Sequence, residues 1–270
     1  MYTIEVLMSA MHQNDLSLAK HSNIQTDVLI INQCDRNGYD EEIYNGHRIR
    51  MISTTERGAS RSRNMAVDNA NGDICIMADD DEEFTNGYPE RILAAYAEKP
   101  DAEMIAFNVT QIDSRMKTKT ISTFRLSPKS QSYGTWSITF KRNAVLEKGI
   151  RFNENFGPGS GKISMSEDSL WCRDAVKSGL RIYQHPFSIA KIGQTESTWF
   201  KGYNEHFFYD RGAYLYCVNA KTCRFVKYYY IYNHWGQTDL SVTEQLHWMN
   251  AGIKGFAMGL SYDEYVNRNK

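Results

Sequence analysis

Apolar runs of strand length recur through the first part of the chain, separated by helical or turn-forming segments. Three such runs are residues 3–9, 27–32 and 74–78, and residues 47–53 are a further candidate strand in which apolar and polar residues alternate. An uncharged run such as 74–78 suits a strand that is covered on both faces, as in a parallel sheet. Helical segments at 15–21 and from about 57 to 70 separate these strands. This alternation predicts an α/β fold with a doubly wound, mostly parallel central sheet.

The middle of the chain continues the pattern with shorter elements. Helices are expected at 86–99, 141–148 and 167–178. Strands are expected at 104–109, 121–126, 133–140, 181–183 and 187–192. The polar segments 35–46 and 111–120 are expected to be loops, because they lack a continuous apolar face.

Three carboxylates, Asp79, Asp80 and Asp81, directly follow the buried strand 74–78. Ligands of open α/β sheets bind beyond the carboxyl ends of the strands. In an extended segment Asp79 and Asp81 would point the same way and offer two oxygen ligands to Mg²⁺ or Mn²⁺. The alternative is a solvated acidic turn, and the position after a buried strand favours the ligand site.

Basic residues cluster at the start of the preceding helix. Arg57, Arg61 and Arg63 lie beside Gly58, where free amide groups and guanidinium groups together suit a phosphate. Cations at a helix start oppose the helix dipole, so a purely structural reason for three of them is weak. The alternative is that they are solvated or paired with Asp68 and Asp73.

The combined motif resembles the nucleotide-sugar half of family 2 glycosyltransferases with the GT-A fold. It reads RGASRSRN, ending at Asn64, then a helix, then GDICIMADDD. It is similar to the branch of bacterial capsular and exopolysaccharide-assembly transferases, and the resemblance covers at least residues 4–186. It implies that 1–110 bind a nucleotide-sugar donor, that 111–195 form the acceptor half, and that Asp79 and Asp81 hold a divalent cation. Donor contacts are expected from Arg57, Gly58, Arg61, Arg63, Asn64, Asp79 and Asp80.

The end of the second strand departs from the family pattern. An aspartate there usually holds uracil, but this chain has Asn32 and Gln33, with Asp35 slightly later. All three are candidate donor contacts. Because of this departure, UDP is a default taken from the resemblance and is not deduced from the residues. The base, the sugar, the acceptor and the linkage stay open.

A glycine-rich loop at 152–162 leads into Glu167 and Asp168, in the order that the family has beside the acceptor. The resemblance makes Asp168, or Glu167 if the helix is rotated, the general base, and places Gly157 and Gly159 near the acceptor. Trp136 and Trp199 are candidates for stacking on a sugar. The structural alternative is that Ser166 caps the helix 167–178 and that acidic residues favour its first turn.

The remainder, 196–270, predicts a helical, aromatic-rich extension. Its last long helix is expected at 237–260, broken at Gly252 or Gly255, with a frayed tail beyond Ser261. The segment 221–235 mixes cations with aromatic residues. Core packing is the first interpretation; a subunit interface and a peripheral membrane contact are alternatives.

Composition limits the functional classes. A formal net charge of −1 argues against a nucleic-acid partner. Five scattered cysteines form neither a disulfide framework nor a zinc pattern. Neither a signal peptide nor a membrane-spanning run is evident, which predicts a cytoplasmic protein, with peripheral contact at the inner face of the membrane left open.

These features predict a metal-dependent transferase that moves a sugar from a nucleoside diphosphate to a saccharide hydroxyl. The resemblance implies inversion at the anomeric carbon, and the residues alone leave retention open. A lipid-linked acceptor and the oligomeric state are left open. The alternatives are an inactive sugar-binding or scaffold protein on the same fold, and a metal-dependent phosphoester enzyme. Against a dehalogenase-type phosphatase, Glu83 stands where that motif needs Thr or Val.

Overall fold

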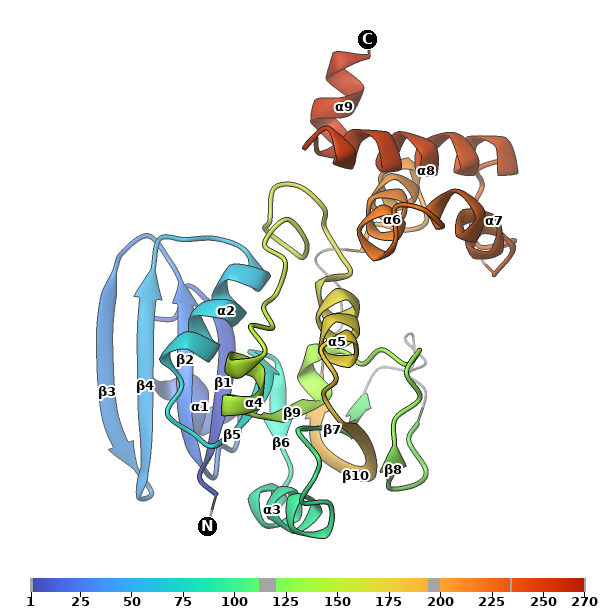
Figure 1. The fold of residues 1–270 in the computed structure, drawn as a ribbon. Helices are drawn as coiled ribbons and strands as arrows, with labels where there is room; N and C mark the ends of the chain where they lie inside the picture. Colours follow the sequence, from blue (N-terminus) through green and yellow to red (C-terminus); the bar gives the residue numbers. More distant parts are fainter. Residues whose placement is uncertain (1, 112–119, 194–199, 234, 270) are drawn as a thin grey trace. The chain divides into compact units, whose positions relative to one another are not determined.

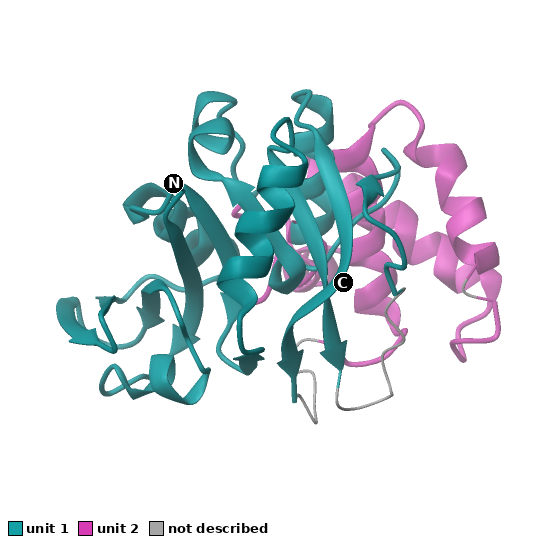
Figure 2. Ribbon diagram, turned by 90° about the horizontal axis from the view of Figure 1, so that it is seen from below, with its two compact units in different colours: residues 1–153, 168–195 teal, residues 154–167, 196–270 magenta. Residues whose placement is uncertain are grey.

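The computed structural model describes residues 2–111, 120–193, 200–233 and 235–269 (Figure 1). The chain forms two compact units (Figure 2). Unit 1 comprises Met1–Asn153 and Asp168–Thr195, and unit 2 comprises Glu154–Glu167 and Glu196–Lys270. The glycine-rich loop thus groups with the C-terminal helices, whereas the sequence analysis divides the chain at residue 195.

Unit 1 is built on one mixed sheet. Its path runs β3-β4-β2-β1-β5-β9-β7-β10-β6, and β8 pairs with β10. The strands are β1 (Ile4–Met11), β2 (Asp27–Gln33), β3 (Gly38–Tyr44), β4 (His47–Thr54), β5 (Ile74–Asp79), β6 (Glu82–Phe84), β7 (Met104–Gln111), β8 (Arg125–Leu126), β9 (Ile138–Lys141) and β10 (Ile182–Ile192). The neighbours β4, β2, β1 and β5 are parallel, as are β7 and β10. The predicted α/β fold is confirmed, but the sheet is mixed, not mostly parallel, because β3, β6, β8 and β9 pair antiparallel with their neighbours.

Helices cover both faces of this sheet. They are α1 (Ser17–His21), α2 (Ala59–Asn69), α3 (Tyr88–Glu98), α4 (Arg142–Glu147) and α5 (Glu167–Lys177). On one face, α1 and α3 pack against strand residues such as Val6 and Ile76. On the other face, α2, α4 and α5 pack against residues such as Leu7 and Met77. Successive strand residues point to opposite faces, so one run of apolar residues supplies both cores.

Three expectations about unit 1 are wrong. The segment 35–46 is not only loop, because β3 pairs antiparallel with β4 along its length. The segment 133–140 is not one strand, because the short 3₁₀ helix η1 (Thr135–Ser137) precedes β9. Of 121–126, only β8 is strand; the loop expected at 111–120 lies mostly outside the described residues.

Unit 2 combines the glycine-rich loop with a set of C-terminal helices. It contains α6 (Glu205–Val218), α7 (Cys223–Asn233), α8 (Val242–Ala257) and α9 (Tyr262–Arg268). A Cβ atom added at Gly252 of α8 would lie 1.9 Å from the carbonyl oxygen of Tyr209 in α6, and one at Gly212 would lie 2.1 Å from that of Met249. The glycines thus let the two helix backbones approach closely, and α8 continues unbroken through Gly252 and Gly255.

The expected frayed tail is also wrong. Ser261 and Glu264 form a capping box at the start of α9, with the serine hydroxyl accepting from the Glu264 amide and the Glu264 carboxylate accepting from the Ser261 amide. Lys162 also donates to Glu264 at 3.0 Å. Within the described ranges, no helix is long and apolar enough to span a membrane.

Candidate nucleotide-sugar site

The candidate site lies where the direction of chain progression changes, between β1 and β5. The chain moves from β1 to β2 and β4 on one side, then to β5 on the other. The register pairs Ser9 with Asp79 and Ala10 with Asn32, so the carboxyl ends of three strands meet at one edge. This is the position at which open α/β sheets bind ligands.

Asp79 is held by an arginine and a neighbouring backbone turn. Arg63 Nη2 donates to Asp79 Oδ1 at 2.9 Å, and the arginine side chain is almost fully buried. The Asp79 amide donates to Glu82 Oε1 at 2.8 Å. Asp80 and Asp81 form a turn, so the expected extended alternation of the three aspartates is wrong. The turn folds the chain back so that Glu82 faces Asp79.

Glu82 is a member of the acidic cluster that the sequence analysis missed. It is 2 % exposed, and its Oε2 atom has no hydrogen-bond partner among the residues that the structure describes. Burial, and then the charge of Asp79, raises the pKa of Glu82 well above its usual range. Burial and Asp79 also raise the pKa of Asp80. The sequence pointed to Glu82 only as the fourth acidic residue in a row, and its polarity alone would predict that it is exposed to solvent.

The cluster fits a divalent cation only as part of a larger complex. Within the described part of the chain, no group of three or more His, Cys, Asp or Glu side chains is arranged to hold a metal ion. Asp79 and Asp81 supply hard oxygen donors, which suit Mg²⁺ or Mn²⁺, ions that commonly complete their shell with substrate phosphate and water. Burial is the main cause of the raised pKa values of Asp80 and Glu82, and the charge of Asp79 is the second; a cation beside Asp79 would relieve this second effect.

Two predicted donor contacts, Arg57 and Asp35, form an ion pair. Arg57 Nη2 lies 2.7 Å from Asp35 Oδ1, and Nη1 donates to the Cys34 carbonyl at 2.9 Å. Asp35 is 91 % exposed, so solvent screens this pair strongly. The contact ties the segment after β2 to the start of α2.

Gln33 and Gly58 also contact each other. Gln33 is buried and accepts from the Gly58 amide at 2.7 Å. Gly58 has φ +120°, a conformation that favours glycine, and it is the residue before α2. Arg61 lies exposed on the first turn of α2. Gln33 thus fixes the helix start and leaves Arg61 facing solvent.

Asn32 and Asn64 are both engaged by the protein backbone. Asn32 is fully buried and exchanges two hydrogen bonds of 2.9 Å with the backbone of Gln13. Asn64 donates to the Phe152 carbonyl at 3.0 Å and accepts from the Phe152 amide at 2.9 Å. The geometry shows both asparagines holding loops in place, and their direct contact with a nucleotide stays a prediction.

The predicted catalytic pair is split between two environments. Asp168 is partly exposed, and its Oδ1 accepts from the Ser169 amide at 2.6 Å. Glu167 is 8 % exposed, and a Cβ atom at Gly157 would lie 3.0 Å from its Cδ atom. Ser166 has φ +76° and its hydroxyl accepts from Arg211 at 2.9 Å. Exposure favours Asp168 over Glu167 as the group that a substrate can reach.

The tryptophans predicted to stack on sugar have different outcomes. Trp136 lies in η1 and packs partly buried against the core on the α1 and α3 face of the sheet. A Cβ atom at Gly134 would lie 2.3 Å from its ring. Trp199 lies outside the described residues. Core packing accounts for Trp136 as the structure shows it.

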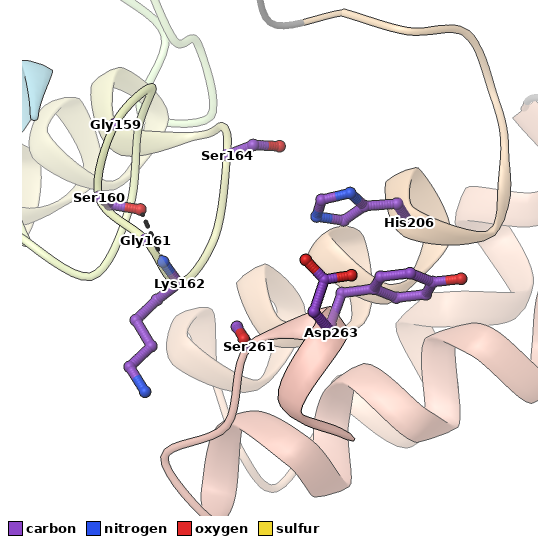
Figure 3. Close-up of a pocket in the computed structure, with 9 residues that line it drawn as sticks. Gly159, Ser160, Gly161, Lys162, Ser164, His206, Ser261 and Asp263 are labelled. Carbon is purple, nitrogen blue, oxygen red and sulfur yellow. Dashed lines mark hydrogen bonds between the residues drawn. The ribbon is translucent and has the colours of Figure 1, made fainter. Parts of the chain in front are cut away.

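Unit 2 contains a separate polar pocket, with a cavity volume of about 180 Å³ (Figure 3). It is lined by Gly159, Ser160, Gly161, Lys162, Ser164, His206, Ser261, Tyr262 and Asp263. The His206 ring stacks on Tyr262, with ring centroids 4.7 Å apart and planes 14° apart. His206 Nε2 lies 3.5 Å from the fully buried Asp210, which also accepts two hydrogen bonds from Ser164. Hydrogen bonding to Asp210 raises the pKa of His206.

Comparison with known proteins places the chain in a family. The model of "Glycosyl transferase family 2" matches residues 5–161. Because this match spans more than half of the chain, the protein belongs to glycosyl transferase family 2. An uncharacterized glycosyltransferase of Haemophilus influenzae (strain ATCC 51907 / DSM 11121 / KW20 / Rd) is 24 % identical over 143 residues, 49 % of each chain. The chain thus spans about half the length of that curated relative.

Solved structures share the fold. S. aureus TarS 1-349 in complex with UDP-GlcNAc has a TM-score of 0.57 at 11 % identity, covering 98 % of this chain and 79 % of that one. A second TarS structure has a TM-score of 0.63 at 12 % identity, covering 97 % of this chain and 50 % of that one. These likenesses confirm the expected GT-A type of α/β fold.

Proposed function

We propose that the protein is a glycosyltransferase that moves a sugar from a nucleoside diphosphate, with UDP as the default, to a hydroxyl of a saccharide acceptor. The observation that carries the proposal is the Arg63–Asp79 pair at the switch point, followed by the acidic turn. Family membership supports sugar transfer, and the TarS structure with UDP-GlcNAc supports a nucleotide-sugar donor.

Several site residues would together stabilise the negative charge of the diphosphate leaving group. Asp79 and Asp81 would hold Mn²⁺ or Mg²⁺, which when bound offsets charge on the diphosphate. Buried Arg63 fixes the position of the Asp79 carboxylate, so this metal-binding side chain does not have to be ordered when the donor binds. Exposed Arg61 and the amides at the start of α2 add positive potential for phosphate.

The acceptor side of the proposal rests on Asp168. A general base must reach the acceptor hydroxyl, and Asp168 is partly exposed, whereas Glu167 is buried. Direct attack on the face opposite the diphosphate would invert the anomeric carbon. The acceptor would be lipid-linked if the protein works at a membrane surface.

The test is a donor-turnover assay on Asp168→Asn. Release of nucleoside diphosphate from a panel of UDP-sugars with Mn²⁺ should fall about 10²–10⁴-fold in kcat, with donor affinity retained. Asp174→Asn is the matched control, because Asp174 is exposed on the same helix. Full turnover by Asp168→Asn would assign the base elsewhere, and loss in Glu167→Gln alone would assign it to Glu167.

A further inference from the structure

Helix α7 carries a row of exposed aromatic side chains. Its buried residues are Cys223, Lys227 and Ile231, spaced by four. The opposite side carries the α7 aromatic patch, which we define as Phe225, Tyr228, Tyr229, Tyr232 and Trp235. Their exposed fractions are 76, 57, 68, 74 and 72 % respectively. The expected core packing is therefore wrong for these five aromatic residues, although Tyr230 of the same helix packs against the core and Phe207, Phe208 and Tyr209 of α6 are buried.

The patch is large for a surface that faces only water. Helical spacing of three and four places the first four rings beside one another, and Trp235 follows the helix end, where its amide donates to the Tyr232 carbonyl. At roughly 200 Å² per ring, these exposed fractions amount to several hundred Å². Contiguous patches of this size mark an interaction surface.

The charges around the patch identify the kind of partner. Lys221 and Arg224 are exposed beside it, and no Asp or Glu occurs anywhere between residues 211 and 238. Tyrosine and tryptophan with flanking cations suit the headgroup region, where each ring is apolar at one end and wet at the other. An isologous contact with a second copy of this chain would instead bring like cations together around the two-fold axis.

Lys227 does not take part in this surface. It is 7 % exposed and its Nζ atom donates to Asn250 at 2.5 Å, so it anchors α7 to α8. The positive charge available to a partner comes from Lys221 and Arg224 at the helix start. The helix is about 16 Å long at 1.5 Å per residue, which suits lying in the interface plane.

We propose that the α7 aromatic patch docks unit 2 onto the surface of an anionic lipid bilayer, with α7 lying parallel to the membrane plane. The inference does not depend on sugar transfer, because it rests on the exposed side chains of one helix. It also gives a physical reason for a lipid-linked acceptor, which this docking would bring to the enzyme.

The experiment is co-sedimentation of the full chain with phosphatidylcholine vesicles, with and without phosphatidylglycerol, in the absence of nucleotide. The wild type should sediment with the anionic vesicles. Replacing Phe225, Tyr229 and Tyr232 by serine should weaken binding about tenfold or more, because the buried apolar area is lost. Replacing Lys221 and Arg224 by glutamine should lower the affinity for the anionic vesicles roughly fivefold per cation and leave the affinity for the phosphatidylcholine vesicles unchanged.

The matched control replaces three exposed residues of β3, Tyr39, Ile43 and Tyr44, by serine. This variant should bind like the wild type, because β3 also carries Asp40, Glu41 and Glu42. Circular dichroism of each variant verifies folding, and quenching of Trp235 by brominated lipid, absent in Trp235→Phe, reports contact directly.

Three results would overturn the proposal. One is wild-type protein that stays in solution with both kinds of vesicle. Another is equal loss of binding in the β3 control. The third is a wild-type protein that does not bind vesicles but forms a concentration-dependent dimer, seen by light scattering without lipid, which the α7 serine variant abolishes. The patch would then be a subunit interface.

Discussion

Asn64→Ala separates a positioning role from a donor-binding role. Asn64 is 4 % exposed and spans 88 residues of sequence to exchange two hydrogen bonds with the backbone of Phe152. Phe152 is itself 2 % exposed, and its ring stacks on Trp171 with centroids 4.9 Å apart. The alanine variant leaves the Phe152 amide and carbonyl buried without these partners.

The expected loss follows from those two groups. Each buried backbone group that loses its partner costs about 1–3 kcal/mol, so the loss of both partners should lower the free energy of unfolding by about 2–6 kcal/mol. Asn69→Ala on the same helix is the control. Asn69 is exposed, and its side chain donates to the Met65 carbonyl one turn back. Both substitutions gain the same helix propensity, at most about 0.7 kcal/mol, so their difference isolates the Phe152 bonds.

Urea unfolding of both variants measures the difference, and titration with UDP at low denaturant measures donor affinity. We expect Asn64→Ala to lose stability while nucleotide affinity of the folded protein changes little. The reasoning is refuted if Asn64→Ala is as stable as Asn69→Ala but loses nucleotide affinity. Asn64 would then touch the donor, as the family resemblance implies.

Two further predictions concern unit 2. Gly157→Ala should lower stability more than Gly161→Ala, because both have positive φ but only the first would push a Cβ atom to 3.0 Å from Glu167; thermal melts that rank them equally would show that Glu167 yields without cost. The raised pKa of His206 beside Asp210 means that its stabilisation is complete below the unfolded pKa of about 6.5 and is lost as pH rises through the folded pKa. The melting temperature of the wild type minus that of His206→Gln should therefore be positive at acid pH and shrink at alkaline pH, and a difference that grows with pH contradicts the ion pair.

Much of the fold could be predicted because each buried strand repeats one simple pattern. The runs at β1, β2 and β5 are largely apolar on both faces, whereas β4 alternates apolar residues with Arg48 and Arg50, and the structure pairs all four in parallel. The edge strand β3 carries Asp40, Glu41 and Glu42 and is mostly exposed, so its strand character comes from backbone bonds to β4 that no local pattern reports.

The predictions for the C-terminal helices were wrong for two different reasons. Gly252 and Gly255 lower helix propensity, but tertiary contact with α6 outweighs that cost where only glycine fits. The sequence contains the Ser261 and Glu264 pattern of a capping box, and this box stabilises α9 although the polar composition of the tail suggested fraying.

The candidate site was predictable in position more than in detail. Asp79 and Arg63 come together as the motif implies. Asn32, Gln33 and Asn64 carry side chains suited equally to a ligand and to a backbone, and only the folded chain shows the backbone partners. Glu82 was missed because burial of a carboxylate depends on the turn before it.

The most direct test of the central claim is calorimetric titration of the wild type, Asp79→Asn and Asp40→Asn with UDP, GDP, CDP and dTDP, each with and without Mn²⁺. Asp40 is an exposed carboxylate on β3 and serves as the control. We predict that one nucleotide binds the wild type more tightly with Mn²⁺, that Asp79→Asn loses this gain, and that Asp40→Asn keeps it. Absence of binding by all four nucleotides, or an equal gain in Asp79→Asn, would contradict a nucleotide-sugar site at the end of β5.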